Sequence, residues 1–568
     1  MTRGRYANAS DAIFSFASLY RRESAFIGGL LIAVAATFSA VANAQEPPAL
    51  QRLLDRIVKQ EQAFLMQLKN RTPLIETYIQ ETLDGHDPPS SGQRDHYFLG
   101  RLDFSSTLAY TPIVARSDAQ KRSRNWRLRK TGVAFDPKGF AQMVFIDSTS
   151  FNTSTYRFEY VRREFLGDVR CLVFDVTPIE KKTAGKFIGR MWVEDRDMNV
   201  VRFNGTYTKA RGSDLYFHFD SWRVDVGEGR WMPAFSYIEE SGEDEKNSAI
   251  FKAQTRIWGY NSGQTARFGE LTTLLVEMEA PVKQADASSD ASPLESQRSW
   301  ERQAEENVID RLEKSGLIAP KGPVDAVLDT VVNNLIATNG LNVETRCRVL
   351  LTTPLETFNV GRTIVISRGL IDVLPDEASL AMVLSDELAH VALAHRTNTQ
   401  FAFHDETMFS DGDLLEHFRF ARSPDEIASA GKKAVEILRN SPYKEKLSNA
   451  GLFLKELASR APSFPNLIRA NLGNRLADGS TLVRMGSLTA EAPRLEEQKL
   501  EQIAALPLGS RIKLDPWTDI IALIKANPIA LLSAREKLSF EIAPLSPHLT
   551  RLAESPSVAS PAVPSMDK

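Results

Sequence analysis

Cysteine is scarce in this sequence of 568 residues, which contains only Cys171 and Cys347. Two cysteines cannot form a disulfide framework, so a small secreted disulfide scaffold is excluded. An excess of one sign of charge is also absent, because 69 Lys and Arg residues are balanced by 72 Asp and Glu residues. A nearly neutral chain lacks the electrostatic footprint of a nucleic-acid-binding protein, and we expect no nucleic-acid partner.

Long apolar runs are absent after the first 44 residues. The one such run, residues 26–42, follows an Arg-Arg pair and ends in Ala-Asn-Ala before a polar stretch. This is the layout of a secretory signal peptide, so we expect residues 1–44 to be removed and the mature chain to begin near Gln45. An uncleaved membrane anchor is the alternative, because about 20 apolar residues span a bilayer. Both interpretations place the rest of the chain in an exported compartment.

The region from residue 45 to 270 changes from a helical to a strand period. Residues 50–80 carry apolar side chains at helical spacing, which predicts one long amphipathic helix. From about Tyr97, segments of strand length rich in Val, Phe, Tyr and Trp alternate with turn residues. A helix followed by consecutive strands predicts a bent antiparallel sheet with the helix packed on it.

In the order of its elements, this region resembles the half-barrel of LolA-like periplasmic lipoprotein carriers, in which a concave sheet shelters an acyl chain. The resemblance implies a lipid or lipoprotein partner for the half-barrel and a periplasmic location. An antiparallel domain that buries its own aromatic side chains is the alternative interpretation. Plain secretion also stays open.

A polar linker, residues 271–299, separates this region from a mainly helical domain at 300–470. Within that domain, residues 347–360 and 363–374 read as two strands, and the second runs into a helix from Asp376 to about His395. The chain is therefore expected to be an α+β protein. Residues 471–550 carry no motif that indicates a role, and the tail at 551–568 is expected to be disordered.

The helix that begins at Asp376 contains the sequence LSDELAHVALAH. In a zinc peptidase helix of the type His-Glu-x-x-His, two histidines at i and i+4 bind the metal and the glutamate acts as general base. Here Asp386 stands at the position of the first histidine, and it is followed by Glu387 and His390. The motif is thus a zinc-peptidase pattern with an altered first ligand, or a core helix that happens to be similar.

The surrounding order of residues favours the first interpretation, because it resembles the zinc-metallopeptidase family of the CAAX prenyl protease, HtpX and BepA. The resemblance spans about residues 300–460, and its residues are Phe358-Asn359, Ser367-Arg368-Gly369-Leu370, Asp376-Glu377, Leu380 and Asp386-Glu387-x-x-His390. It implies a zincin-like fold, a Zn²⁺ cofactor, His390 as second ligand and Glu387 as the base that activates a metal-bound water.

The third zinc ligand of that family is a glutamate on a later helix, which corresponds here to the stretch SPDEIASAGKKAVEILRNSPY. One alignment register places Ser429 at this position, and another recruits Glu426. With Glu426, the set Asp386, His390 and Glu426 would have one histidine and two carboxylates, which is less selective for zinc than a His-His-Glu site. With Ser429, only two of the expected ligands remain.

Two functions follow from this pattern. The first is an exported zinc-dependent metalloendopeptidase that cleaves envelope or secreted proteins, with Glu387 as base. The second is a pseudoenzyme, a peptidase-like scaffold or chaperone that holds unfolded or lipidated envelope partners without catalysis. The altered ligand positions favour an inherited fold with an impaired metal site. The oligomeric state is not indicated by the sequence.

Overall fold

The computed structural model of this chain describes residues 48–551, with shorter gaps and with longer ones at 83–93, 114–134, 210–216, 241–249, 262–292, 403–417, 526–539 and 543–548. The predicted signal peptide, the tail and most of the predicted linker lie outside the described residues. The chain divides into two compact units, Met1–Leu53 and Leu54–Lys568. Among the described helices, none combines the length and the apolar character needed to cross a membrane.

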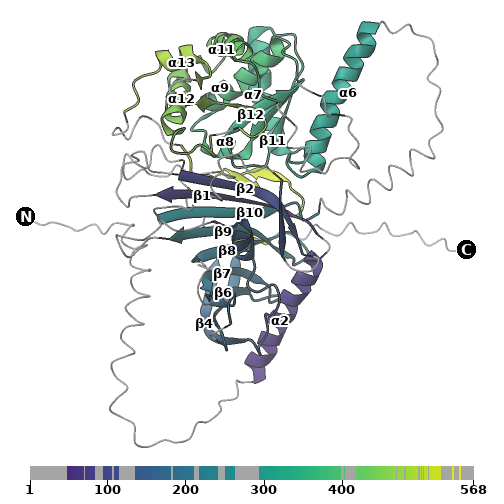
Figure 1. Cartoon of the computed structure of the whole chain (residues 1–568), viewed down its shortest axis with the longest axis vertical. Helices are drawn as coiled ribbons and strands as arrows, with labels where there is room; N and C mark the ends of the chain where they lie inside the picture. Colours follow the sequence, from purple (N-terminus) through teal and green to yellow (C-terminus); the bar gives the residue numbers. More distant parts are fainter. Residues whose placement is uncertain are drawn as a thin grey trace, which may run out of the picture. The chain divides into compact units, whose positions relative to one another are not determined.

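The N-terminal half is dominated by one open antiparallel sheet of ten strands in the order β3-β2-β1-β10-β9-β8-β7-β6-β5-β4. Apart from the pairing of β1 with β10, neighbouring strands in this order are consecutive in the sequence, and Figure 1 shows β1, β2 and β10 side by side. The bounds of the strands are β1 Leu74–Thr82, β2 Arg94–Asp103, β3 Ala109–Pro112, β4 Tyr156–Leu166, β5 Val169–Pro178, β6 Phe187–Glu194, β7 Val200–Tyr207, β8 Phe219–Asp225, β9 Trp231–Glu240 and β10 Ile250–Trp258. The predicted α+β class, with the sheet first and the helices after it, is confirmed.

Helix α2, Pro48–Leu68, is shorter than the helix predicted for residues 50–80. The last part of that prediction was wrong, because Leu74–Thr82 forms β1. Pro73 lacks a backbone N–H and disfavours helix on its N-terminal side. β1 is then paired along its whole length with β10 and with β2. Long-range strand pairing has overridden the local helical spacing.

The two faces of this sheet have different surroundings. One face, the helix face, carries Ile75, Ile257 and Met232, which pack against Phe64 and Leu68 of α2. Because side chains alternate along a strand, Glu76 points to the opposite face. There its carboxylate accepts hydrogen bonds from Thr353 N at 2.6 Å and from Arg368 Nη2 at 3.1 Å.

This opposite face joins the sheet to the C-terminal half. Asp95 of β2 accepts hydrogen bonds from the backbone N–H groups of Asn466 and Leu467. The Trp258 indole N–H donates to Gly316 O at 2.8 Å. A single buried apolar cluster contains side chains from both halves. The sheet and the helical part therefore form one continuous core.

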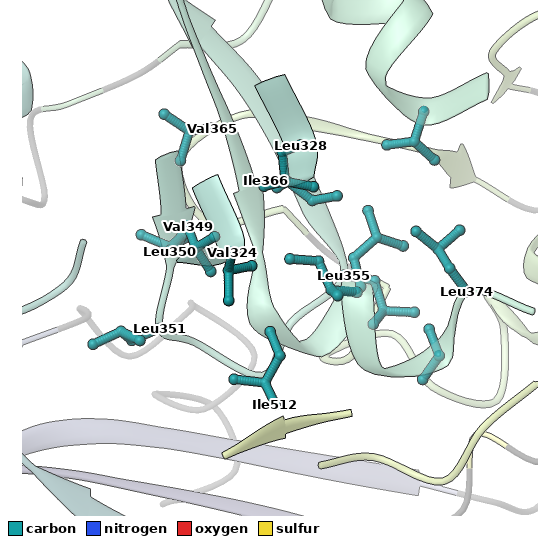
Figure 2. Packing of buried hydrophobic residues seen from close by; sticks show 14 of the residues in the cluster. Val324, Leu328, Val349, Leu350, Leu351, Leu355, Val365, Ile366, Leu374 and Ile512 are labelled. Carbon is teal, nitrogen blue, oxygen red and sulfur yellow. The ribbon is translucent and has the colours of Figure 1, made fainter. Parts of the chain in front are cut away.

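The C-terminal half contains a four-stranded sheet with the order β11-β13-β12-β14, surrounded by helices. Its strands are β11 Arg346–Leu350, β12 Glu356–Val360, β13 Thr363–Ser367 and β14 Asn474–Arg475, and the main helices are α6 Pro293–Lys314, α7 Pro323–Asn339, α8 Arg368–Val373, α9 Glu377–Ala392, α11 Pro424–Arg439 and α12 Leu447–Arg460. Figure 2 shows Val324 and Leu328 of α7 beside Val349 and Ile366 in the core of this half.

Shorter elements complete the chain. They are α4 Pro137–Gln142, the 3-10 helix η1 Lys444–Lys446, α13 Gly486–Glu491, the hairpin of β15 Ala477–Asp478 with β16 Leu482–Val483, and the hairpin of β17 Ile512–Leu514 with β18 Ile521–Leu523. The stretch 347–360, expected to be one strand, is divided into β11 and β12. It is divided because the backbone N–H groups of Leu351 and Leu355 donate to Leu317 O and Leu467 O instead of to a neighbouring strand.

Candidate functional site

Helix α9 carries the peptidase-like motif through the centre of the C-terminal half. Its N-cap is Asp376, whose side chain accepts a hydrogen bond from Ser379 N at 2.8 Å and so fixes the start of the helix. The side chains of Asp386, Glu387 and His390 are all buried. Neither acidic side chain therefore faces solvent.

A buried arginine from the C-terminal segment reaches both acidic residues. Arg484 Nη1 donates to Asp386 Oδ2 at 2.7 Å and to Glu387 Oε1 at 3.0 Å. All three side chains are at most 4% exposed. Buried charges need a partner of opposite sign, because their hydration is lost. Arg484 is the cation that makes burial of these two carboxylates possible.

One cation is shared by two carboxylates, so the charges do not balance. Asp386 Oδ1 is buried and has no hydrogen-bond partner within the described structure. Burial, followed by the neighbouring Glu387, raises the pKa of Asp386 to about 6, although Arg484 acts in the opposite direction. The Thr357 hydroxyl of β12 donates to Glu387 Oε1 at 2.8 Å. Glu387 is thereby held by two donors.

His390 and His395, at the end of the helix, contact each other rather than a carboxylate. Their Nδ1 atoms lie 2.8 Å apart in a hydrogen bond that requires one ring to donate and the other to accept. Burial lowers the pKa of His390 to about 4. Burial also lowers the pKa of His395, so burial favours the neutral form of both rings. His404 and His417, which also lie near the motif in sequence, fall outside the described residues.

The candidates for the third ligand lie on the surface of α11. Glu426 is the N3 residue of a capping box, and its carboxylate accepts hydrogen bonds from Ser423 N and Ser423 Oγ at 3.0 Å. Ser423 also lowers the pKa of Glu426. The exposed Ser429 hydroxyl donates to Glu426 O within the same helix. Neither side chain is brought to the carboxylates of α9.

As arranged, these residues do not fit a zinc ion. A catalytic zinc requires three protein donors around one position and a fourth place for water. Here Arg484 lies against Asp386 and Glu387, and Glu426 is engaged at a helix N-terminus. Among the described residues, no group of three His, Cys, Asp or Glu side chains could hold a metal ion. Zinc binding and the roles assigned to these residues stay predictions that a metal measurement can decide.

Sequence reasoning missed Arg484, which lies in the segment that carried no recognised motif. Its hydrogen bond to Asp386 spans 98 positions of the chain. The one local signal is an arginine between apolar residues in the stretch LVRMG, which predicts that the arginine has a buried partner. Nothing in the sequence says which carboxylates those partners are.

A polar cavity of about 540 Å³ lies beside α2, next to the β6–β7 and β8–β9 connections. Its lining includes Gln60 of α2, Arg196 and Asp197 after β6, Arg230 and Trp231 at the start of β9, and Arg551. Arg551 is already paired with Glu194 at 2.6 Å. The charges of the lining are mixed in sign, so the cavity has no evident preference for an anion or a cation.

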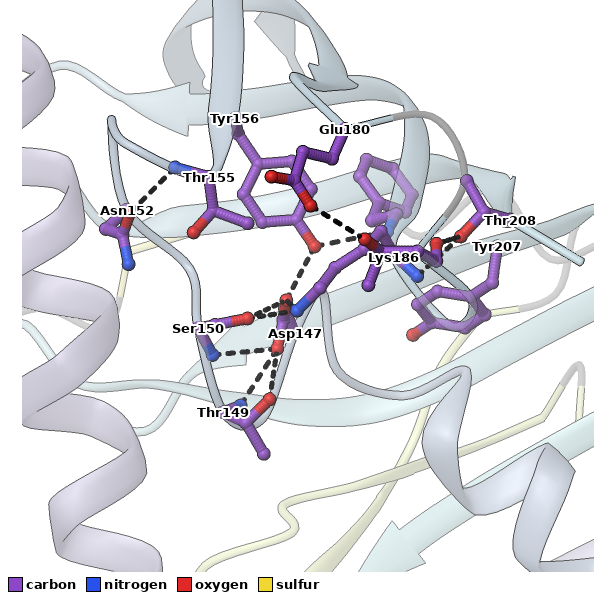
Figure 3. A network of polar contacts seen from close by, with 12 residues as sticks. Asp147, Thr149, Ser150, Asn152, Thr155, Tyr156, Glu180, Lys186, Tyr207 and Thr208 are labelled. Atoms are coloured by element: carbon purple, nitrogen blue, oxygen red, sulfur yellow. Dashed lines mark hydrogen bonds and ion pairs between the residues drawn. The ribbon is translucent and has the colours of Figure 1, made fainter. Parts of the chain in front are cut away.

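A cluster around Asp147 resembles a catalytic serine-lysine arrangement at first sight (Figure 3). Lys186 Nζ lies against Ser150 Oγ, and it donates to Asp147 Oδ2 at 3.0 Å. The Tyr156 hydroxyl donates to the same carboxylate oxygen at 2.6 Å. An ammonium group that is paired with a carboxylate cannot take a proton from the serine. The cluster fastens the 147–150 turn to β4 and β6.

Comparisons with known proteins are sparse for this chain. The sequence matches no known protein family, and no curated protein matches it. Among solved structures, it is similar to an outer membrane lipoprotein-sorting protein domain from Vibrio parahaemolyticus, with a TM-score of 0.20 and 10% sequence identity. That similarity covers 35% of this chain and 89% of the other.

Proposed function

We propose that this chain is an exported, non-catalytic binding protein of the cell envelope, built on a peptidase-like helical domain and an antiparallel half-barrel. Its clients are unfolded or lipidated envelope proteins. The chain is then a pseudoenzyme, in which the helix of a former peptidase site has a structural role.

The buried contact of Arg484 with Asp386 and Glu387 carries this proposal. Metal-assisted peptide hydrolysis requires a carboxylate that is free to accept a proton from a bound water. The Glu387 carboxylate instead accepts hydrogen bonds from Arg484 and from Thr357. A hydrogen bond to the charged form of a carboxylate makes that carboxylate a weaker base. The arrangement therefore favours a structural role for Glu387.

The half-barrel contributes an apolar sheet face to the proposed binding of lipidated clients. In the structure, this face is covered by the chain's own side chains, among them Phe64 of α2 and Val144 and Phe145 after α4. An acyl chain would replace these side chains on Ile75 and Ile257. Burial of apolar surface stabilises either arrangement by roughly 25 cal/mol per Å², so exchange of one for the other is energetically feasible.

The test is to measure the zinc content and the peptidase activity of the purified mature chain together. We expect far less than one zinc per chain, and we expect unfolded casein to be cleaved no faster by the natural protein than by Glu387→Gln. The proposal is refuted by about one zinc per chain with cleavage that disappears in Glu387→Gln. That result would establish the metalloendopeptidase instead.

A further inference from the structure

The segment that precedes Arg484 in the chain lies along the β12 side of the four-stranded sheet. We define the strap as residues 471–478 together with Arg484. β14, within the strap, pairs with β12 through Glu356 opposite Arg475 and Thr357 opposite Asn474. We propose that the strap is an internal strand that closes the edge of β12, and that its release lets an extended peptide of an unfolded client pair with β12.

Strand pairing alone is too weak to hold the strap. The pairing of β14 with β12 covers only two residues on each strand. Short unsupported strand pairs have little stability in water. The strap must therefore be held by other contacts, and the structure supplies them at two points, one at each end.

The first point is the carboxylate of Glu356, at the start of β12. Its Oε2 accepts hydrogen bonds from three successive backbone N–H groups, those of Asn471, Leu472 and Gly473, at 2.8, 2.9 and 3.3 Å. Glu356 is fully buried. If the strap leaves, this buried carboxyl loses all three donors at once, and a buried acceptor without a partner is costly. This contact, the N-terminal clamp, fixes the strap where it approaches β12.

The second point is the guanidinium of Arg484, which binds the strap to α9. Its Nε donates to Arg475 O at 3.1 Å, and its Nη2 donates to Asn474 O at 2.9 Å. The remaining Nη1 reaches Asp386 and Glu387. This contact, the C-terminal clamp, therefore joins the backbone of β14 to two buried carboxylates through one side chain.

The strap fits the sheet edge closely at Gly473. A Cβ atom at this position would lie 2.5 Å from Thr357 O and 2.8 Å from Phe358 Cβ, both of them on β12. On its other side, Leu472 O accepts a hydrogen bond from Phe420 N at 2.8 Å. The strap thus lies between β12 and the 420–422 segment, where it takes the hydrogen-bonding groups that an added strand would need.

An unpaired strand edge is a template for another extended chain, and main-chain hydrogen bonds supply the affinity in such additions. If the strap leaves, β12 becomes such an edge inside a site that is rich in carboxylates. The ligand class is therefore an extended, unfolded peptide. This step rests on the proposed function for the nature of the client, whereas closure by the strap does not.

The test uses trypsin, because the bond after Arg475 lies within the strap and the next residue, Leu476, is buried. Arg484→Met removes the C-terminal clamp, Glu356→Ala removes the N-terminal clamp, and Gly473→Val displaces the strap without any change of charge. Under conditions in which each variant is folded, we expect cleavage after Arg475 to be at least about tenfold faster than in the natural protein. The reason is that each substitution lowers the free energy needed to open the strap locally.

The matched control is Arg223→Met, which breaks a buried arginine-glutamate pair in the half-barrel, far from the strap in sequence. It should lower global stability and leave cleavage after Arg475 unchanged. The second readout is binding of dye-labelled, reduced and carboxymethylated lactalbumin, followed by fluorescence anisotropy. We expect affinity at least about tenfold higher in the opened variants, since pairing with a free strand edge supplies main-chain hydrogen bonds.

The inference is overturned if the bond after Arg475 stays as resistant in all three variants as in the natural protein. It is equally overturned if the opened variants bind no more lactalbumin than Arg223→Met does. Should Arg484→Met fail to fold, Gly473→Val carries the same test with every charge in place. Zinc-dependent cleavage by the natural protein would refute the proposed function and would leave the trypsin result unaffected.

Discussion

Three buried carboxylate sites in this chain differ in the number of cations that each receives. Between α2 and β8, Glu61 and Arg223 form a one-to-one pair through two parallel hydrogen bonds of 2.8 and 2.7 Å. On α9, Asp386 and Glu387 share the single guanidinium of Arg484. The Glu356 carboxylate accepts hydrogen bonds from backbone N–H groups, and no cation is paired with it among the described residues. At these three sites within the described residues, one guanidinium serves one carboxylate, one guanidinium serves two carboxylates, and one carboxylate has no guanidinium.

The pKa values of the buried carboxyl groups reflect how many cations each group receives. Burial raises the pKa of Asp386 to about 6, and it raises the pKa of Glu356 to about 7. A raised pKa means that the charged form is destabilised relative to water. Asp386 therefore takes up a proton more readily than a free carboxyl does, which lessens the negative charge that one hydrogen-bonded guanidinium leaves uncompensated.

The largest effect is expected from Arg484→Met, because it leaves two carboxylates buried without a cation. Loss of one partner of a buried pair costs about 3–5 kcal/mol, and here the upper end of that range applies. Urea unfolding at pH 8 measures the loss. A loss below about 1 kcal/mol, the usual worth of an exposed pair, would show that the carboxylates do not depend on Arg484.

Arg223→Met is expected to come second, at about 3 kcal/mol, because it leaves one carboxylate unpaired instead of two. The same urea experiment gives the value. The ranking is the informative result. If Arg223→Met costs as much as Arg484→Met, the number of carboxylates for each guanidinium does not determine the cost, and the comparison fails.

Glu356→Gln tests the carboxylate that has no cation. Because the pKa of Glu356 is raised to about 7, the folded chain takes up this proton at a higher pH than the unfolded chain does. The contribution of Glu356 is therefore most favourable below about pH 4.5 and is lost as the pH rises to 7, with a slope of at most about 1.4 kcal/mol per pH unit.

The glutamine variant keeps an acceptor for the three N–H groups. Because glutamine does not titrate, this side chain adds no pH dependence to the free energy of unfolding. We expect it to be more stable than the natural protein at pH 8 and equally stable at pH 4.5. Urea unfolding at both pH values measures the difference. An unchanged pH dependence would mean that Glu356 titrates normally in the folded chain.

The smallest effect is expected from added metal. A ligand that binds the folded chain stabilises it in proportion to the logarithm of its concentration over Kd. Since Arg484 lies against the carboxylates of α9, zinc added in slight excess should leave the unfolding temperature of the natural protein unchanged. In Arg484→Met, in which the two buried carboxylates lack a cation, the same addition should raise it. A rise in the natural protein would show that a metal competes with Arg484.

Local pattern was sufficient for much of the fold. The two-residue period of the segments after Tyr97 predicted the antiparallel strands, and the helical spacing in residues 376–395 predicted α9. Local pattern failed for β1, because the pairing of Leu74–Thr82 with β10 joins residues far apart in the chain. A short stretch of sequence does not show which distant segment will pair with it.

The candidate site shows the same limit. The motif on α9 drew attention to Asp386 and Glu387, whose shared partner lies almost a hundred positions later. Glu426 was a candidate ligand in one of two alignment registers with the metallopeptidase family, and in the structure its carboxylate caps α11. An acidic residue in the first turn of a helix has a local use that competes with any distant one.

The late position of Arg484 in the chain also affects the order of synthesis. When α9 leaves the ribosome, its two carboxylates have no partner yet, and they must stay hydrated or protonated until residue 484 follows. A chain that is truncated before this residue cannot bury α9 without leaving two charges in an apolar interior. The core around α9 can therefore form only after the C-terminal segment has been synthesised. A metal ion acquired from the surroundings would give no such check.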